Sequence, residues 1–138
     1  MPLPTSHIPS RLLAAGALTL SLALGAMIMP ATAAAKGGDA IRVTGSCSGH
    51  STSKLKAKHD DGRIEVEFEV DQNRNRQQWR VKLWDDGIRV FSGYRWTAPP
   101  SGSFSLERRI ANRAGTDTIK AKAVNVKSGE ICRATLNV

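Results

Sequence analysis

Beyond Gly38, the hydrophobic positions of this chain recur at every second residue rather than at the spacing of a helix. Gly, Asp, Asn, Pro or Ser interrupt this alternation at intervals of roughly eight to twelve residues, as expected where strands end in turns. We therefore predict an all-β chain with no helix. The predicted strands lie at about 40–47, 53–59, 63–70, 77–84, 88–96, 103–111, 118–126 and 131–138.

The first predicted hairpin turns at Asp61-Gly62, a pair typical of two-residue turns with positive φ. Such a turn fixes the register, and Leu55 would then face Phe68 on one side of the hairpin. On the other side, lysines would face glutamates, as Lys56 faces Glu67. Apolar residues meet apolar residues and opposite charges meet, which favours this register.

The second predicted hairpin turns at Asp86-Gly87. In its two-residue register, Trp79 would pair with Tyr94 on the inward side, while Trp84 and Phe91 would lie on the outward side.

The third predicted hairpin turns at Ser128-Gly129 and would place Ala121 opposite Leu136. Cys132 then falls on the inward side of the last strand, and Cys47 falls on the inward side of the first strand. We expect these strands to pack close together across the core.

These elements predict an antiparallel two-sheet sandwich of about seven or eight strands, with a buried tryptophan on a central strand. A small β-barrel is the alternative.

The N-terminal part of the chain has the layout of a secretory signal peptide. Arg11 precedes an apolar run from Leu12 to Met29, and small residues follow at 31–35. We expect cleavage near Ala35 and a secreted, extracellular protein. A retained membrane anchor is the alternative, because the run is long enough to span a bilayer.

The expected organisation is a signal peptide at 1–35, a short flexible segment at 36–39 and a single β-sandwich domain at 40–138. Cleavage would remove Arg11 and no acid, so the formal charge would fall from +8 to +7. The only two cysteines, Cys47 and Cys132, are expected to form a disulfide in an oxidising compartment.

The export segment and the cysteine pair, together with the segments 68–74 (FEVDQNR) and 112–117 (NRAGTD), resemble a group of small secreted bacterial proteins with one disulfide and no assigned function. The resemblance covers essentially the whole mature chain. It implies secretion and a sandwich similar to immunoglobulin or fibronectin type III domains, and it carries over no catalytic residue.

No motif of the chain indicates an enzyme, a metal site or a cofactor. The histidines His50 and His59 are interpreted as loop and strand-end residues, because the pattern of a nucleophile elbow is missing. The acid pairs Asp60-Asp61 and Asp85-Asp86 each stand directly before a glycine, which is typical of turns rather than of calcium loops.

The candidate binding surface combines aromatic and basic residues on and beside the second hairpin. Its predicted members are Arg80, Trp84, Arg89, Phe91, Arg95 and Trp96. Such a surface suits an anionic polymer or a glycan, because arginine pairs with phosphate and carboxylate groups and aromatic rings stack on sugars. An extracellular protein is the alternative partner, through the same aromatics and the proline-rich loop at 97–102. Nucleic acid is not expected as the target because no recognition motif is present.

Overall fold

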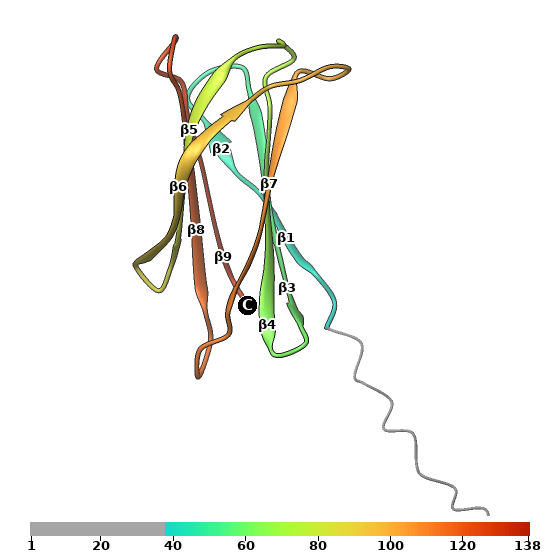
Figure 1. The fold of residues 1–138 in the computed structure, drawn as a ribbon, viewed down its shortest axis with the longest axis vertical. Helices are drawn as coiled ribbons and strands as arrows, with labels where there is room; N and C mark the ends of the chain where they lie inside the picture. The colour runs from blue at the N-terminus through green and yellow to red at the C-terminus, as the bar shows by residue number, and fades with distance from the viewer. Residues whose placement is uncertain (1–37) are drawn as a thin grey trace, which may run out of the picture. The chain divides into compact units, whose positions relative to one another are not determined.

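The chain forms nine strands in two antiparallel sheets over residues 38–138, the part that the computed structural model describes (Figure 1). One sheet has the order β1 (Ile41–Thr44), β3 (Thr52–Asp60), β4 (Arg63–Asp71), β7 (Ser103–Ala111). The other has the order β2 (Ser46–Cys47), β9 (Ile131–Asn137), β8 (Thr118–Asn125), β5 (Gln78–Asp85), β6 (Ile88–Trp96).

The two sheets are separate layers and do not close on each other, so the predicted sandwich is confirmed and the barrel is wrong. The strand order is not that of a constant-type immunoglobulin domain. In that domain, strands A and B belong to one sheet and the next strand, C, belongs to the opposite sheet. Here β3 and β4 form a hairpin within one sheet. The predicted signal peptide lies outside the described residues. Between residues 38 and 138 there is no helix long and apolar enough to cross a membrane.

The predicted first strand, 40–47, is two strands that belong to different sheets. β1 pairs with β3, whereas β2 pairs with β9. The chain crosses between the layers at Gly45, whose amide donates to Ser53 O at 2.8 Å. A Cβ at Gly45 would lie only 2.5 Å from Arg133 O, so a residue without a side chain is needed for this crossing.

The first hairpin has the predicted register. Leu55 pairs with Phe68 and Lys56 pairs with Glu67. Both turn residues have positive φ, 47° at Asp61 and 72° at Gly62, as a type I′ turn requires.

The second hairpin follows its predicted register for only two pairs. Trp84 faces Arg89 as expected, but a β-bulge then inserts Val90, and Leu83 faces Phe91. Every later residue of β6 is therefore shifted by one position, which reverses the side of the sheet to which it points. The predicted pair of Trp79 and Tyr94 is wrong, because Trp79 pairs with Arg95.

The third hairpin keeps the predicted inward phase but not the predicted partners. Ala121 pairs with Ala134 rather than with Leu136, a shift of two residues. The connection is longer than a two-residue turn because Asn125 organises it: the Asn125 side-chain oxygen accepts from the amides of Lys127 and Ser128, both at 2.9 Å.

The core lies between the two sheets and is built from the inward residues of both. Trp79 on β5 is fully buried, as predicted for a tryptophan on a central strand, and its ring lies 6.2 Å from that of Phe104 in the other sheet. The other fully buried large apolar side chains include Leu55, Ile64, Phe68, Val81, Leu83 and Ile119.

Cys47 and Cys132 form the predicted disulfide. They are not placed across the core, however. They face each other directly on the neighbouring strands β2 and β9 of one sheet. This follows from the crossing at Gly45, which delivers the second half of the predicted first strand to the same sheet as the last strand.

Candidate binding site

The two sheets differ sharply in their balance of charge. The strands of each sheet contain seven lysines and arginines, but the four-stranded sheet also contains six acids and the five-stranded sheet contains one. That single acid, Asp85, is buried. The outward side of the five-stranded sheet is therefore basic without compensation from the sheet itself.

We call this outward side the basic face. On β5, β8 and β9 its residues alternate with buried residues of the core. They are Arg80, Lys82 and Trp84 on β5, Arg89, Ser92, Tyr94 and Trp96 on β6, Lys120, Lys122 and Val124 on β8, and Arg133 and Thr135 on β9.

The centre of the basic face is a row of three like charges. Lys82 on β5 faces Lys122 on β8, and Lys122 in turn faces Arg133 on β9. Neighbouring strands lie about 4.8 Å apart, so the row spans roughly 10 Å. Like charges directly opposite one another destabilise a sheet. None of the salt bridges found between residues 38 and 138 involves these three side chains.

A shallow hollow of about 380 Å³ lies between this row and the neighbouring row of Trp84, Lys120 and Thr135. Trp84, Lys120, Lys122, Arg133 and Thr135 contribute to its lining. Trp84 is partly buried and faces Lys120 across the strands. The hollow thus offers three cationic groups, a hydroxyl and an indole ring to the same bound group.

The other end of the basic face is apolar. Trp96 is 57% exposed, Tyr94 is 54% exposed and Val126, which follows β8, is 55% exposed. Tyr94 and Val126, together with Arg80, help to line a second hollow of about 290 Å³. Aromatic rings therefore extend the cationic surface along β6.

Four of the six predicted site residues lie on the basic face, and two do not. Arg80, Trp84, Arg89 and Trp96 point outward.

Phe91 and Arg95 were predicted to point outward, and this is wrong because the bulge at Val90 turns both to the inward side. Phe91 packs against the core. The Arg95 guanidinium carbon lies 5.1 Å from its ring centroid, and that of Arg108 on β7 lies 4.5 Å away. These three residues bridge the sheet edges formed by β6 and β7 and so have a structural role.

The basic face also includes residues that sequence reasoning left out of the site. Tyr94 was assigned to the core because the bulge was not foreseen. Arg133 and Thr135 could have been found from the alternation of β9, since Cys132 and Ala134 point inward. Their position beside Lys122 depends on the register of the third hairpin. The predicted register of this hairpin differs from the observed one by two residues.

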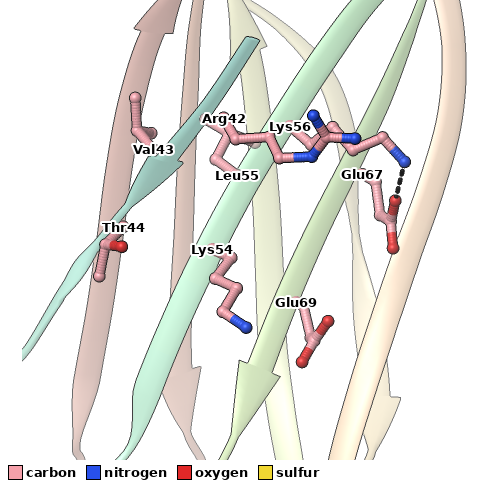
Figure 2. Close-up of a pocket in the computed structure, with 8 residues that line it drawn as sticks. All are labelled: Arg42, Val43, Thr44, Lys54, Leu55, Lys56, Glu67 and Glu69. Atoms are coloured by element: carbon pink, nitrogen blue, oxygen red, sulfur yellow. Dashed lines mark hydrogen bonds and ion pairs between the residues drawn. The ribbon is translucent and has the colours of Figure 1, made fainter. Parts of the chain in front are cut away.

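A hollow of about 480 Å³ lies on the opposite side of the molecule, over β1, β3 and β4 (Figure 2). Arg42, Lys54 and Lys56 line it together with Glu67 and Glu69. Lys56 Nζ lies 2.8 Å from Glu67 Oε2, and the hydrogen bond from this ammonium group lowers the pKa of Glu67. Because two carboxylates stand among its three cations, this hollow is less suited to an anion than the basic face.

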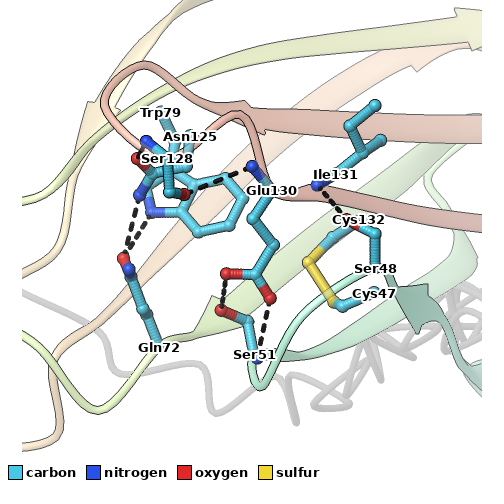
Figure 3. Close-up of a disulfide and its surroundings, with 10 residues drawn as sticks. All are labelled: Cys47, Ser48, Ser51, Gln72, Trp79, Asn125, Ser128, Glu130, Ile131 and Cys132. Carbon is cyan, nitrogen blue, oxygen red and sulfur yellow. Dashed lines mark hydrogen bonds between the residues drawn. A yellow bond between two sulfur atoms is a disulfide. The ribbon is translucent and has the colours of Figure 1, made fainter.

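A fourth hollow, of about 440 Å³, lies beside the disulfide and includes His50, Ser51 and Glu130. Figure 3 shows that the Glu130 carboxylate accepts from both Ser51 N, at 2.8 Å, and Ser51 Oγ, at 2.9 Å. His59 lies near the far end of β3, where seven residue steps of about 3.3 Å place it roughly 23 Å from the start of the strand that follows His50. The two histidines therefore do not share a site.

The same region holds the polar network of the buried tryptophan (Figure 3). Trp79 Nε1 donates to Gln72 Oε1 at 3.0 Å, and Asn125 Nδ2 donates to the same oxygen at 3.1 Å. These polar side chains satisfy one another and hold the loops at this end of the sandwich.

The chain matches no protein-family model, and no curated protein matches it in sequence.

Proposed function

We propose that this protein is a non-enzymatic binding domain that acts outside the cell and holds an anionic polymer, such as an acidic glycan or a cell-envelope polymer, on its basic face. The row of Lys82, Lys122 and Arg133 carries this proposal. Three like charges side by side cost free energy in the unbound protein, and a polyanion that lies along the row removes this cost.

The aromatic residues of the basic face support a polymer as the ligand. Trp84 shares the central hollow with the cations, and Tyr94 and Trp96 continue the face along β6. Ring faces that alternate with cations can stack on sugar rings while the charges bind acidic groups of the same chain. The disulfide supports an extracellular location, since such bonds persist in oxidising compartments.

The test compares two double variants that each remove two positive charges. Lys122→Gln with Arg133→Gln alters the basic face, and Arg42→Gln with Lys54→Gln alters the opposite sheet. Binding of the purified protein to polygalacturonate, with neutral dextran as a reference polymer, is measured at 50 and 300 mM NaCl. We expect the first variant to bind at least tenfold more weakly and the slope of log affinity against log salt to fall by roughly two.

The opposite-sheet variant should lose no more than about threefold, because it keeps the local row and changes only the net charge. Equal losses in the two variants would mean that attraction is unspecific, and this would contradict a site on the basic face.

A protein partner is the second candidate, favoured by the adjacent exposed Tyr94, Trp96 and Val126. An interface centred on these residues would be mainly apolar and would persist at 300 mM NaCl. In that case Trp96→Ala would abolish capture of the partner, while the variant of Lys122 and Arg133 would retain it.

A further inference from the structure

The turn between β5 and β6 and the loop between β7 and β8 lie at the same end of the sandwich (Figure 1). Three carboxylates converge there. Asp85 ends β5, Asp86 begins the turn and Asp117 directly precedes β8. One oxygen of each carboxylate lies within 4.8 Å of an oxygen of both others. We call these three residues the acidic cluster.

The backbone holds the acidic cluster in place. Asp86 N donates to Thr118 O at 3.0 Å, and Thr118 N donates to Asp86 Oδ1 at 2.9 Å. Asp117 exchanges two backbone hydrogen bonds with Val138. The three carboxylates are therefore brought together by strand pairing and not by a flexible loop alone.

Arg113 is the one cation in direct contact with the acidic cluster among the described residues. Its Nε donates to Asp85 Oδ2 at 3.0 Å, and its backbone amide donates to Asp117 Oδ1 at 3.3 Å. One guanidinium against three carboxylates leaves a formal charge of −2, in a protein whose overall formal charge is +8.

Two oxygens of the acidic cluster are buried without a partner. Asp85 is 1% exposed and Asp117 is 0% exposed, yet Asp85 Oδ1 and Asp117 Oδ2 accept no hydrogen bond within the described part of the chain. A buried carboxylate oxygen without a partner costs several kcal/mol in general unless a proton or a cation compensates it. These atoms are therefore an independent indication that something binds here.

We propose that Asp85, Asp86 and Asp117 bind a calcium ion. A divalent cation matches the formal charge of −2 that Arg113 leaves, and carboxylate oxygens are the ligands that calcium prefers. Calcium accepts six to eight oxygens in flexible geometry, so three carboxylates and solvent at the exposed Asp86 can complete its shell. Magnesium, which demands near-ideal octahedral geometry and gives up its water reluctantly, fits three carboxylates fixed by the backbone less well.

The first hairpin provides a matched control for the test. Its sequence Asp60-Asp61-Gly62 repeats Asp85-Asp86-Gly87, and Asp61 has the same φ of 47° as Asp86. Asp60, however, pairs with Arg109 at 3.0 Å and belongs to no group of three ligands in the described residues. Asp61→Asn therefore changes the same type of turn residue without affecting the proposed site.

The experiment titrates CaCl₂ or MgCl₂ at constant ionic strength into the EDTA-treated protein at pH 7.5, with isothermal calorimetry and thermal unfolding as readouts. We expect one calcium ion per chain with Kd between about 0.1 and 1 mM. At ten times Kd, Tm should rise by roughly 5 °C. Asp86→Asn should weaken binding at least fivefold, and Asp117→Asn should abolish it.

Asp61→Asn should bind calcium as the unmodified protein does. Because Asp86 is exposed and asparagine tolerates positive φ, Asp86→Asn tests the proposal even if the Asp117 variant fails to fold. No saturation up to about 10 mM calcium, with Tm rising on acidification instead, would show that a proton compensates Asp85 and would overturn the proposal. Equal affinity for magnesium, or an equal loss in Asp61→Asn, would overturn it as well.

Discussion

Gly102 lies where the loop between β6 and β7 passes the backbone of Asn73 and Arg74. Its φ is +70°, and a Cβ there would lie 2.7 Å from Asn73 C and 2.8 Å from Arg74 C. Backbone atoms cannot move aside as the end of a flexible side chain can. This single residue thus lets the two loops at one end of the sandwich approach each other, as Gly45 lets the chain pass between the sheets.

Gly102→Ala is expected to destabilise the protein by about 3 kcal/mol or more, because it adds backbone strain and a steric conflict. Gly62→Ala is the matched control. Gly62 has nearly the same φ, +72°, but nothing lies within 4 Å of the added methyl group. That variant should lose only about 1 to 2 kcal/mol. Urea unfolding measures both, and equal losses would show that the close approach contributes nothing.

The hairpin of β3 and β4 has a ladder of opposite charges on its outward side. Lys56 pairs with Glu67 at 2.8 Å and Lys58 pairs with Glu65 at 3.2 Å. β4 also pairs with β7 on its other side, and there Glu67 lies directly opposite Glu107. One carboxylate therefore has a favourable neighbour on one strand and an unfavourable one on the next.

The lowered pKa of Glu67 makes its contribution dependent on pH. The hydrogen bond from Lys56 is its main cause, so the stabilisation is present at neutral pH and is lost as the pH falls through the folded pKa. Glu67→Gln should cost up to about 1 kcal/mol at pH 7 and less at pH 3. Glu107→Gln, the control, should be neutral or slightly stabilising at pH 7 because it removes a like-charge pair. Urea unfolding at the two pH values checks both, and a constant cost for Glu67→Gln would contradict the assignment.

Over residues 38–138 the protein is a sandwich in which β2 and β9, strands from the two ends of this part of the chain, are neighbours in one sheet. β2 contributes only two residues to that sheet, and the disulfide joins it to β9. The bond joins two cysteines that are 85 positions apart in the sequence, and the segment between them includes both central hairpins. The covalent link therefore constrains the ends, whereas the hairpins are held by their own ladders.

Replacement of both cysteines by alanine is expected to lower the free energy of unfolding by about 4 kcal/mol, chiefly because the unfolded chain is released from a long loop. Amide hydrogen exchange of the folded variant should accelerate in β1 and β2 and change little in the hairpins of β3 with β4 and β5 with β6. Faster exchange spread evenly over all nine strands would contradict this division.

How far the sequence predicts each hairpin depends on its turn. Asp61-Gly62 and Asp86-Gly87 were identified from residue type because aspartate and glycine tolerate positive φ, and both turns form. The register of β5 with β6 could not be followed further, because a bulge at Val90 shifts it and turns Phe91 toward Arg108 of β7, a contact between segments distant in the sequence. The connection near Ser128 was misjudged because the side chain of Asn125 holds a longer loop.

For the binding surface, the sequence supplied the residue types and part of their arrangement. Arg80, Trp84 and Arg89 were placed correctly because they lie before the bulge, whereas Phe91 and Arg95 lie at it or beyond it. The alignment of Lys122 with Lys82 brings β8 beside β5, a strand distant in the sequence, and its alignment with Arg133 depends on the loop that joins β8 to β9. No local pattern contains that information.

By itself, the sequence determined the all-β class, the pair of layers and the inward and outward phase of most strands. The reason is that alternation and turn chemistry act over only a few residues. The tertiary structure decided which strands are neighbours, where the first strand changes sheets, and how the acids and bases are distributed between the two sheets. Those features depend on contacts between distant segments, such as the approach of Gly45 to Arg133 and of Asp85 to Asp117. Both the basic face and the acidic cluster arise from these contacts.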